Sequence, residues 1–207
     1  SRVVTGVQTC ALPIYFKEMF MKILYSNEAN FKDEFRALVD RSNIDMQSVM
    51  PIVNGIINDI KERGDIALNE QIAKFDKWEV NGNLAITTNE MKEAYDNLDS
   101  KLRDALELAY KRVKAYHEKQ VEKSWIDFEP SGAILGQKVT PVDRAGLYIP
   151  GGKAAYPSSL IMNAVPAIVA GVKEIVVCTP AVGGEVNSLL LAAMHLLGIK
   201  TAYKVGG

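Results

Sequence analysis

Tyr148 and the turn Pro150-Gly151-Gly152 are the residues of this 207-residue chain whose types and spacing favour ligand binding. A short apolar run at residues 145–149 precedes the turn, an apolar segment ending at Gly171 follows it, and residues 174–178 form a second β-rich run. The order strand, glycine-rich loop, helix and strand predicts a βαβ unit with parallel strands. Ligands of such sheets bind beyond the carboxyl ends of the strands, so we expect this loop to lie where chemistry takes place.

Two simpler interpretations of the loop stay open. Tyr148 could be an aromatic residue at the rim of a half-buried strand, and Gly151 and Gly152 could serve only a tight turn. The chain has no GxGxxG motif. The sequence therefore does not support a pyrophosphate held in the usual Rossmann manner.

Cys178 ends the second β-rich run, where a thiol nucleophile would be well placed. No histidine or other base lies near it in the sequence, and we favour a small buried apolar role for this cysteine. His117 and His195 are isolated from each other and from clustered carboxylates. We expect structural or surface roles for both histidines rather than zinc ligation.

Charge and cysteine content narrow the classes of function. The chain has 24 basic and 25 acidic residues and a net charge of −1, which gives no electrostatic case for nucleic acid or an anionic membrane. Its longest apolar stretch, residues 160–172, is too short to span a bilayer. Cys10 and Cys178 cannot build a disulfide framework or a cysteine-based zinc site, so a reducing cytoplasm is the expected location.

The pattern is helical over residues 31–120. Gly64 is a plausible stop for one helix, Asp65 can cap the next, residues 87–90 have capping-box spacing, and Asp99-Ser100 precede a long helix. Apolar residues recur at three- and four-residue spacing along these helices, which predicts packing faces. These residues are Val49, Ile52, Val53, Ile56, Ile57 and Ile60; Leu68, Ile72 and Phe75; and Leu102, Ala105, Leu106, Ala109, Val113 and Tyr116.

The second part of the chain is richer in strands. Residues 129–132 (EPSG) end the helical part, and residues 133–142 predict a strand or hairpin arm. Ser158 or Ser159 can cap the helix of the βαβ unit, residues 185–197 predict a further helix, and residues 201–205 predict a third strand. Few charged residues lie beyond residue 144, which is typical of a parallel sheet covered on both faces.

Three regions are expected along the chain. Residues 1–20 are predicted to be foreign, because residues 1–14 fit neither helical nor strand periodicity and resemble a translated sequencing adapter. Residues 21–130 form a helical region, and residues 131–207 begin an α/β domain. The third strand ends in Val205-Gly206-Gly207 as its loop begins, so we expect a fragment truncated at the C-terminus.

Several motifs together resemble the histidinol dehydrogenase family. The motif GLYIPGG at residues 146–152 is followed by YPSS at 156–159 and by NAVPA at 163–167. The similarity extends upstream to AKFD at 73–76 and downstream to VGG at 205–207. A glycine-rich loop alone is a weak signal, whereas this combination is specific to the family.

The resemblance implies a Rossmann-like α/β fold related to the aldehyde dehydrogenases, in a homodimer that uses zinc and NAD. Such an enzyme oxidises L-histidinol to L-histidine through the aldehyde, in histidine biosynthesis. Tyr148 matches the family's NAD-contacting tyrosine, with Pro150, Gly151 and Gly152 beside it in the cofactor site. The family's catalytic Glu-His pair and its zinc ligands lie in its second half, so we expect no catalytic residue and no metal ligand up to Gly207.

Two other functions stay open. One is a different enzyme of the aldehyde dehydrogenase superfamily that works through Cys178. The other is a non-catalytic module for binding or dimerisation, in which the helical region supplies the contact surface.

Overall fold

The computed structural model describes residues 2–4, 23–40, 46–151 and 156–206. The chain divides into two compact units, residues 1–62 and 63–207. Within the described ranges, no helix has both the length and the apolar character needed to cross a membrane. The domain limits expected from the sequence remain a prediction.

The first unit holds a small antiparallel pair of strands, β1 (Arg2–Val4) and β2 (Ile23–Tyr25), and two helices, α1 (Phe31–Asp40) and α2 (Met46–Arg63). The predicted stop at Gly64 is confirmed, since α2 ends at Arg63 and Gly64 has a φ of 59°. The predicted packing face on α2 is not covered within the first unit, where Val49, Ile52, Val53 and Ile57 are all at least 40% exposed. An apolar stripe is buried only where another element covers it, and no described element of residues 1–62 does so.

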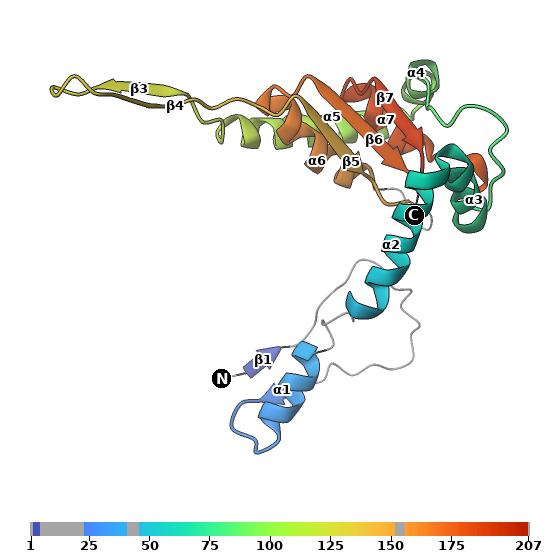
Figure 1. Ribbon diagram of the computed structural model, residues 1–207, viewed down its shortest axis with the longest axis horizontal. Coiled ribbons are helices and arrows are strands. Elements are labelled where there is room, and N and C mark those ends of the chain that lie inside the picture. Colours follow the sequence, from blue (N-terminus) through green and yellow to red (C-terminus); the bar gives the residue numbers. More distant parts are fainter. Residues whose placement is uncertain (1, 5–22, 41–45, 152–155, 207) are drawn as a thin grey trace. The chain divides into compact units, whose positions relative to one another are not determined.

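The second unit is built around a three-stranded parallel sheet, as the βαβ pattern predicts (Figure 1). Its strands lie in the order β5 (Arg144–Tyr148), β6 (Glu174–Thr179) and β7 (Thr201–Lys204). The helices are α3 (Asp65–Phe75), α4 (Thr88–Asp96), α5 (Ser100–Glu118), α6 (Pro157–Ala170) and α7 (Ser188–Leu196), with a short 3-10 turn, η1 (Val182–Gly184). The predicted α/β class is therefore confirmed.

One face of the sheet carries the core. Val177 on β6 and Ala202 on β7 are buried there, in one cluster with Leu160 of α6 and Met194 of α7. Connections of the same hand that move across a sheet in one direction place their helices on the same face, which explains why α6 and α7 pack together. The opposite face is covered only in part: Leu68 and Asn69 of α3 line a pocket with Cys178, whereas Tyr148 is 52% exposed. The prediction of cover on both faces is therefore met only in part among the described residues.

Residues 84–86 close the outer edge of β7. The Ile86 N–H donates to the Ala202 carbonyl at 2.8 Å, the Lys204 N–H donates to the Leu84 carbonyl at 2.8 Å, and Ala85 pairs antiparallel with Tyr203. This short segment satisfies backbone groups that an open edge would expose.

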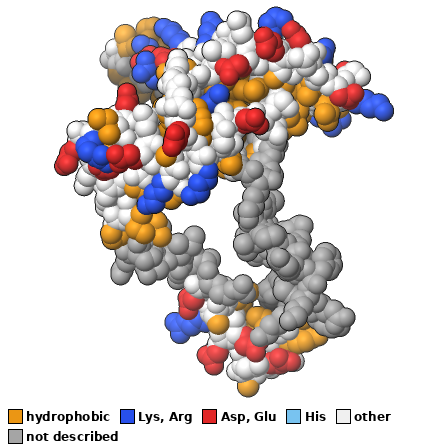
Figure 2. Space-filling view, turned by 90° about the vertical axis from the view of Figure 1, so that its right-hand side faces the viewer, with side chains coloured by type: hydrophobic (Ala, Val, Ile, Leu, Met, Phe, Trp, Pro, Cys, Tyr) orange, Lys and Arg blue, Asp and Glu red, His pale blue; other side chains and the backbone are white. Residues whose placement is uncertain are grey.

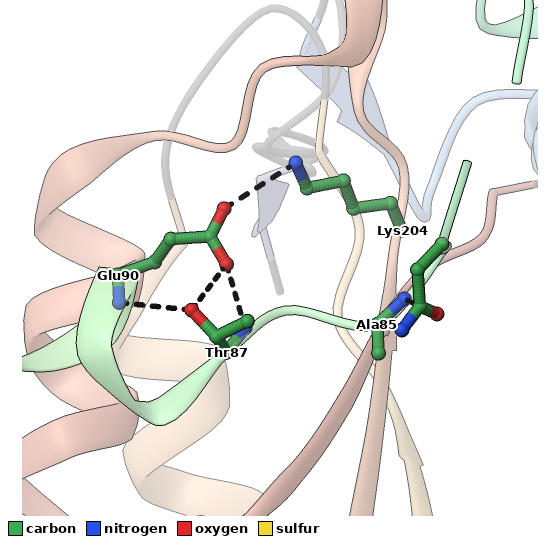
Figure 3. A network of polar contacts seen from close by, with 5 residues as sticks. Ala85, Thr87, Glu90 and Lys204 are labelled. Atoms are coloured by element: carbon green, nitrogen blue, oxygen red, sulfur yellow. Dashed lines mark hydrogen bonds and ion pairs between the residues drawn. The ribbon is translucent and has the colours of Figure 1, made fainter. Parts of the chain in front are cut away.

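The predicted capping box at the start of α4 is confirmed (Figure 3). The Glu90 N–H donates to Thr87 Oγ1 at 3.1 Å, and the Thr87 N–H donates to Glu90 Oε2 at 2.6 Å. The other carboxylate oxygen of Glu90 lies 3.6 Å from Nζ of Lys204 at the end of β7. The box therefore joins the first turn of α4 to the sheet.

Other sequence expectations need correction. Residues 129–132 connect the two strands of a hairpin, β3 (Trp125–Phe128) and β4 (Ile134–Gln137), and β3 was not predicted. Neither Ser158 nor Ser159 caps α6, because the helix begins at Pro157, a residue suited to the first turn since it needs no N–H partner. Asp65 is the first residue of α3 rather than its cap. Phe75, Leu102 and Tyr116 lie on exposed sides of their helices.

Candidate functional site

The candidate site is the carboxyl edge of the sheet, where β5, β6 and β7 end side by side. The register pairs Tyr148 with Cys178 and Cys178 with Tyr203, so the three side chains form a row across one face. Tyr148 is 52% exposed and Tyr203 is 38% exposed, while Cys178 between them is half-buried. The row gives this edge a partly aromatic surface that a planar ligand could cover.

The loop after β5 starts from a fixed position. The Ile149 N–H donates to the Cys178 carbonyl at 2.9 Å, and the Ile149 side chain is fully buried. A Cβ atom at Gly151 would lie 2.9 Å from Cγ of Pro180, so the glycine lets the loops after β5 and β6 touch. Of the predicted cofactor-binding residues, Tyr148, Pro150 and Gly151 thus share this edge, and Gly152 lies outside the described residues.

Asp76 also reaches this edge, although the sequence assigned it no role. It follows α3 and is 5% exposed, and its carbonyl accepts the Gly183 N–H at 3.0 Å. A Cβ atom at Gly206 would lie 2.8 Å from both carboxylate oxygens of Asp76. One signal was present in the sequence: an acidic residue at a helix C-terminus is electrostatically unfavourable, so its presence there indicates another purpose.

The structure disfavours Cys178 as a nucleophile. Burial raises the pKa of its thiol, so the reactive thiolate is less populated at neutral pH than in an exposed cysteine. The side chain lines a pocket of about 440 Å³ together with Leu68 and Asn69 of α3 and Tyr203 of β7. Cys178 is half-buried and lines a pocket, so the fully buried packing role favoured from the sequence is met only in part.

The two histidines lie apart from the sheet edge. The ring of His195 on α7 packs against Tyr95 of α4, with 5.1 Å between centroids. His117 near the end of α5 is hydrogen-bonded through Nδ1 to Oε1 of Gln120 at 2.7 Å. In the described ranges, no group of three or more His, Cys, Asp or Glu residues is arranged to hold a metal ion.

Charges are mixed on the molecular surface. Lys, Arg, Asp and Glu side chains are interspersed over the face shown in Figure 2, in keeping with the net charge of −1. At the sheet edge itself, Lys204 is paired with Glu90 and lies 5.7 Å above the ring of Trp78.

Comparison with known proteins identifies a family and several relatives that this chain resembles. The family model described as histidinol dehydrogenase matches residues 39–207. The chain is 59% identical over 189 residues to the histidinol dehydrogenase of Wolinella succinogenes and 57% identical over 184 residues to that of Sulfurimonas denitrificans. These matches cover 90% and 88% of this chain, but only 44% and 43% of the relatives. The chain therefore spans less than half the length of the curated relatives it matches.

A solved structure agrees with the family match. The crystal structure of histidinol dehydrogenase from Elizabethkingia anophelis superposes with a TM-score of 0.71 at 32% sequence identity. The similarity covers 77% of this chain and 37% of that one.

Proposed function

Because this chain belongs to the histidinol dehydrogenase family, we propose that it forms the first part of an enzyme that oxidises L-histidinol to L-histidine with NAD. Its own contribution is to bind and orient the cofactor at the carboxyl edge of the sheet. The observation that carries this proposal is the exposed Tyr148 ring at the end of β5, beside a loop fixed by Ile149 and Gly151.

The strand order supports this location independently of the family. The outer edge of β7 is taken by residues 84–86, whereas β5 has no second neighbour among the described strands. A further parallel strand could join the sheet only beside β5. The loops after β5 and after the added strand would then lead to opposite sides of the sheet, which creates the crevice at which ligands of Rossmann-like sheets bind. Tyr148 would lie at the mouth of that crevice.

The residues at the sheet edge would bind the cofactor through the exposed Tyr148 ring and through loops that are already held in place. The Tyr148 ring offers a flat surface to a planar part of the cofactor, and covering it excludes water from that part. The contact between Gly151 and Pro180 holds the flanking loops in place before the ligand arrives. NAD, once bound, supplies the acceptor for hydride.

Zinc is also implied by the resemblance, but the described residues contain no group of three or more His, Cys, Asp or Glu side chains that fits it. The resemblance itself assigns the catalytic base and the metal ligands to the second half of the enzyme. The complete enzyme is expected to be a cytoplasmic homodimer.

A second role, in assembly, is favoured by the β3–β4 hairpin. Its register places Ile126, Phe128 and Ile134 on one face, and all three are more than 60% exposed. A contiguous apolar face of this kind is typical of a surface that another polypeptide covers. The hairpin could contact the second half of the enzyme or a second subunit while the sheet edge binds the cofactor.

NAD binding tests the main proposal directly. Replacing Trp125 with Phe leaves Trp78, which contacts Gly184 in the loop after β6, as the single tryptophan reporter. We expect NAD to change its fluorescence with a saturable dependence on concentration. Tyr148→Ala should weaken this binding about tenfold or more, because roughly half of a tyrosine surface would lose its partner.

Tyr116→Ala is the matched control, since Tyr116 is 63% exposed on α5 and far along the chain from the sheet edge. Equal effects of the two substitutions, or no NAD binding at all, would count against the proposed site. The activity itself needs the extended reading frame, expressed with zinc and supplied with L-histidinol and NAD. NADH formation followed by absorbance is the expected result.

A further inference from the structure

Trp78 lies at the carboxyl edge of the sheet but belongs to no helix or strand. It follows the end of α3, directly after Lys77, whose φ of 56° is a left-handed conformation that residues other than glycine rarely adopt. A Cβ atom on Gly184, in the loop after β6, would lie 2.7 Å from Nε1 and 2.9 Å from Cδ1 of Trp78. The five-membered part of the indole ring therefore lies directly against the Gly184 backbone.

The loop that Trp78 contacts buries little surface of its own. The turn η1 contains two glycines with φ values of 68° and 84°, and the side chain of Val182 is 54% exposed. A segment with few buried apolar contacts opens easily unless other parts of the chain hold it. Two contacts come from the segment after α3: the Gly183 N–H donates to the Asp76 carbonyl at 3.0 Å, and Trp78 packs on Gly184.

The position of η1 affects the loop that carries the proposed cofactor-binding residues. Pro180 begins the loop after β6, and its Cγ lies 2.9 Å from the position that a Cβ atom would occupy on Gly151 in the loop after β5. Only Ala181 separates Pro180 from η1. A displacement of η1 therefore also displaces Pro180 relative to Gly151, next to Tyr148 at the end of β5.

Trp78 is itself held from the end of β7. Nζ of Lys204 lies 5.7 Å from the centroid of the Trp78 ring and 3.6 Å from Oε1 of Glu90, and Figure 3 shows the ammonium group directed at this carboxylate. Attraction between a cation and an aromatic ring favours this position of the indole. Only 19% of the Lys204 side chain is exposed, which limits competition from water. The indole ring thus connects β7 with the loop after β6.

We propose that Trp78 is a positioning residue for the cofactor site: its indole ring holds η1 through Gly184, and Lys204 holds the ring. The contact between the loops after β6 and β5, at Pro180 and Gly151, is then in place before NAD binds. This inference rests on the proposed function, because these loops flank the proposed cofactor site. Trp78 acts on cofactor affinity through the loop and does not itself touch the reacting atoms.

The two glycines of η1 provide a matched pair of substitutions. Both have left-handed φ values, so alanine strains the backbone at each position. A Cβ atom on Gly183 meets no other group of the described chain within 4 Å, whereas one on Gly184 meets the Trp78 ring. By isothermal titration calorimetry, we expect Gly184→Ala to weaken NAD binding about tenfold and Gly183→Ala to weaken it less than about threefold. Equal losses would overturn the proposal, because backbone strain would then account for both.

Substitutions of Trp78 test the ring itself. Trp78→Phe keeps an aromatic ring beside Gly184 and should bind NAD within about threefold of the wild type, whereas Trp78→Ala empties this space and should weaken binding about tenfold or more. In the Trp78→Ala background, Gly184→Ala should cause no larger loss than Gly183→Ala, since its methyl group no longer meets the indole. The same fold loss from Gly184→Ala in both backgrounds would refute a direct connection between the two residues.

Amide hydrogen exchange supplies a readout that does not depend on NAD. In Trp78→Ala, the Gly183 amide should exchange about tenfold faster than in the wild type, while the Ala164 amide of α6 keeps its protection. Unchanged exchange at Gly183 would overturn the proposal whether or not NAD binds. Faster exchange without NAD binding by the wild type would uphold the role of Trp78 in holding the loop and remove the cofactor assignment instead. If Trp78→Ala does not fold, the pair of glycine variants still decides between the two results.

Discussion

Thr87→Ala should destabilise the second unit by about 1 kcal/mol, because it removes the side chain that caps α4. The Thr87 hydroxyl accepts the Glu90 N–H at 3.1 Å and donates to Glu90 Oε2 at 2.8 Å. Without the Thr87 hydroxyl, the Glu90 N–H in the first turn of α4 can bond only to water. The turn that carries the buried Met91 is then less firmly held. Thr87 is itself exposed, so water can partly replace the lost bonds and the effect stays in the middle of the known range.

The measurement is urea unfolding followed by Trp78 fluorescence in the Trp125→Phe background. Trp78 lies under Lys204, whose ammonium is 3.6 Å from Glu90, so its signal reports this part of the fold. A loss of about 1 kcal/mol corresponds to a midpoint lower by roughly 0.3–1 M urea. Thr87→Ser should restore most of the stability, because serine caps as well as threonine.

Thr88→Ala is the matched control for the same chemical change one residue later. Its hydroxyl forms no hydrogen bond with any described residue, so we expect a change within about 0.5 kcal/mol. Alanine favours the helix more than threonine does, so equal losses for Thr87→Ala and Thr88→Ala would show that the hydrogen bonds of the cap do not set the stability. That result would refute the reasoning.

The same network predicts a pH dependence through Glu90. The Thr87 N–H contributes most to lowering the pKa of this carboxyl, the Thr87 hydroxyl and Lys204 lower it further, and partial burial opposes them. A lowered folded-state pKa stabilises the protein above the unfolded pKa, and this stabilisation is lost as the pH falls through the folded pKa. Glu90→Gln should therefore be less stable than the wild type at pH 7 by less than about 1 kcal/mol, since the side chain is 43% exposed. The difference should shrink below the ordinary glutamate pKa, and a difference that grows on acidification would contradict this assignment.

Three further substitutions test the core, a helix end and an internal cap of the second unit. Leu160→Ala should cost about 2–5 kcal/mol in urea unfolding, because this side chain of α6 is fully buried against the sheet. Gly171→Ala should cost about 1–2 kcal/mol from backbone strain alone, since Gly171 has a φ of 86° and the added methyl group would be 3.8 Å from Pro141. Arg103→Met should cost about 1–3 kcal/mol, because the Arg103 guanidinium donates to the carbonyls of Tyr95, Asp96 and Leu98 at the end of α4. A loss below 0.5 kcal/mol in any of the three would count against the mechanism named for it.

The sequence by itself determined the features that depend on neighbouring residues. Gly64 and Gly171 end their helices, Thr87 and Glu90 form the capping box, and Asp99 accepts the N–H groups that open α5. Each of these depends on a side chain and a backbone group a few residues apart, so the pattern of types is sufficient. The parallel order of β5 and β6 was also predictable, because a strand, a helix and a strand in succession allow few arrangements.

Tertiary structure decided which patterned faces are covered. Phe75, Leu102 and Tyr116 belong to apolar stripes in the sequence but are exposed, whereas Leu106 on the same helix as Leu102 is buried. Periodicity predicts that a face exists, and only the position of neighbouring elements determines how wide the covered part is. For the same reason β3 was missed: its pairing with β4 depends on residues across a hairpin turn.

Some residues of the candidate site can be predicted from local sequence, and others cannot. Tyr148 and Gly151 could be found from sequence, since a strand followed by a glycine-rich turn marks the carboxyl end of a parallel sheet. The sequence marks Asp76 as an unusual residue for a helix end but does not show what lies near it, because Gly206 is 130 positions away and the hydrogen bond with Gly183 spans 107. Local chemistry sets how each segment starts and ends, but a site made where three loops converge exists only after the core has brought them together.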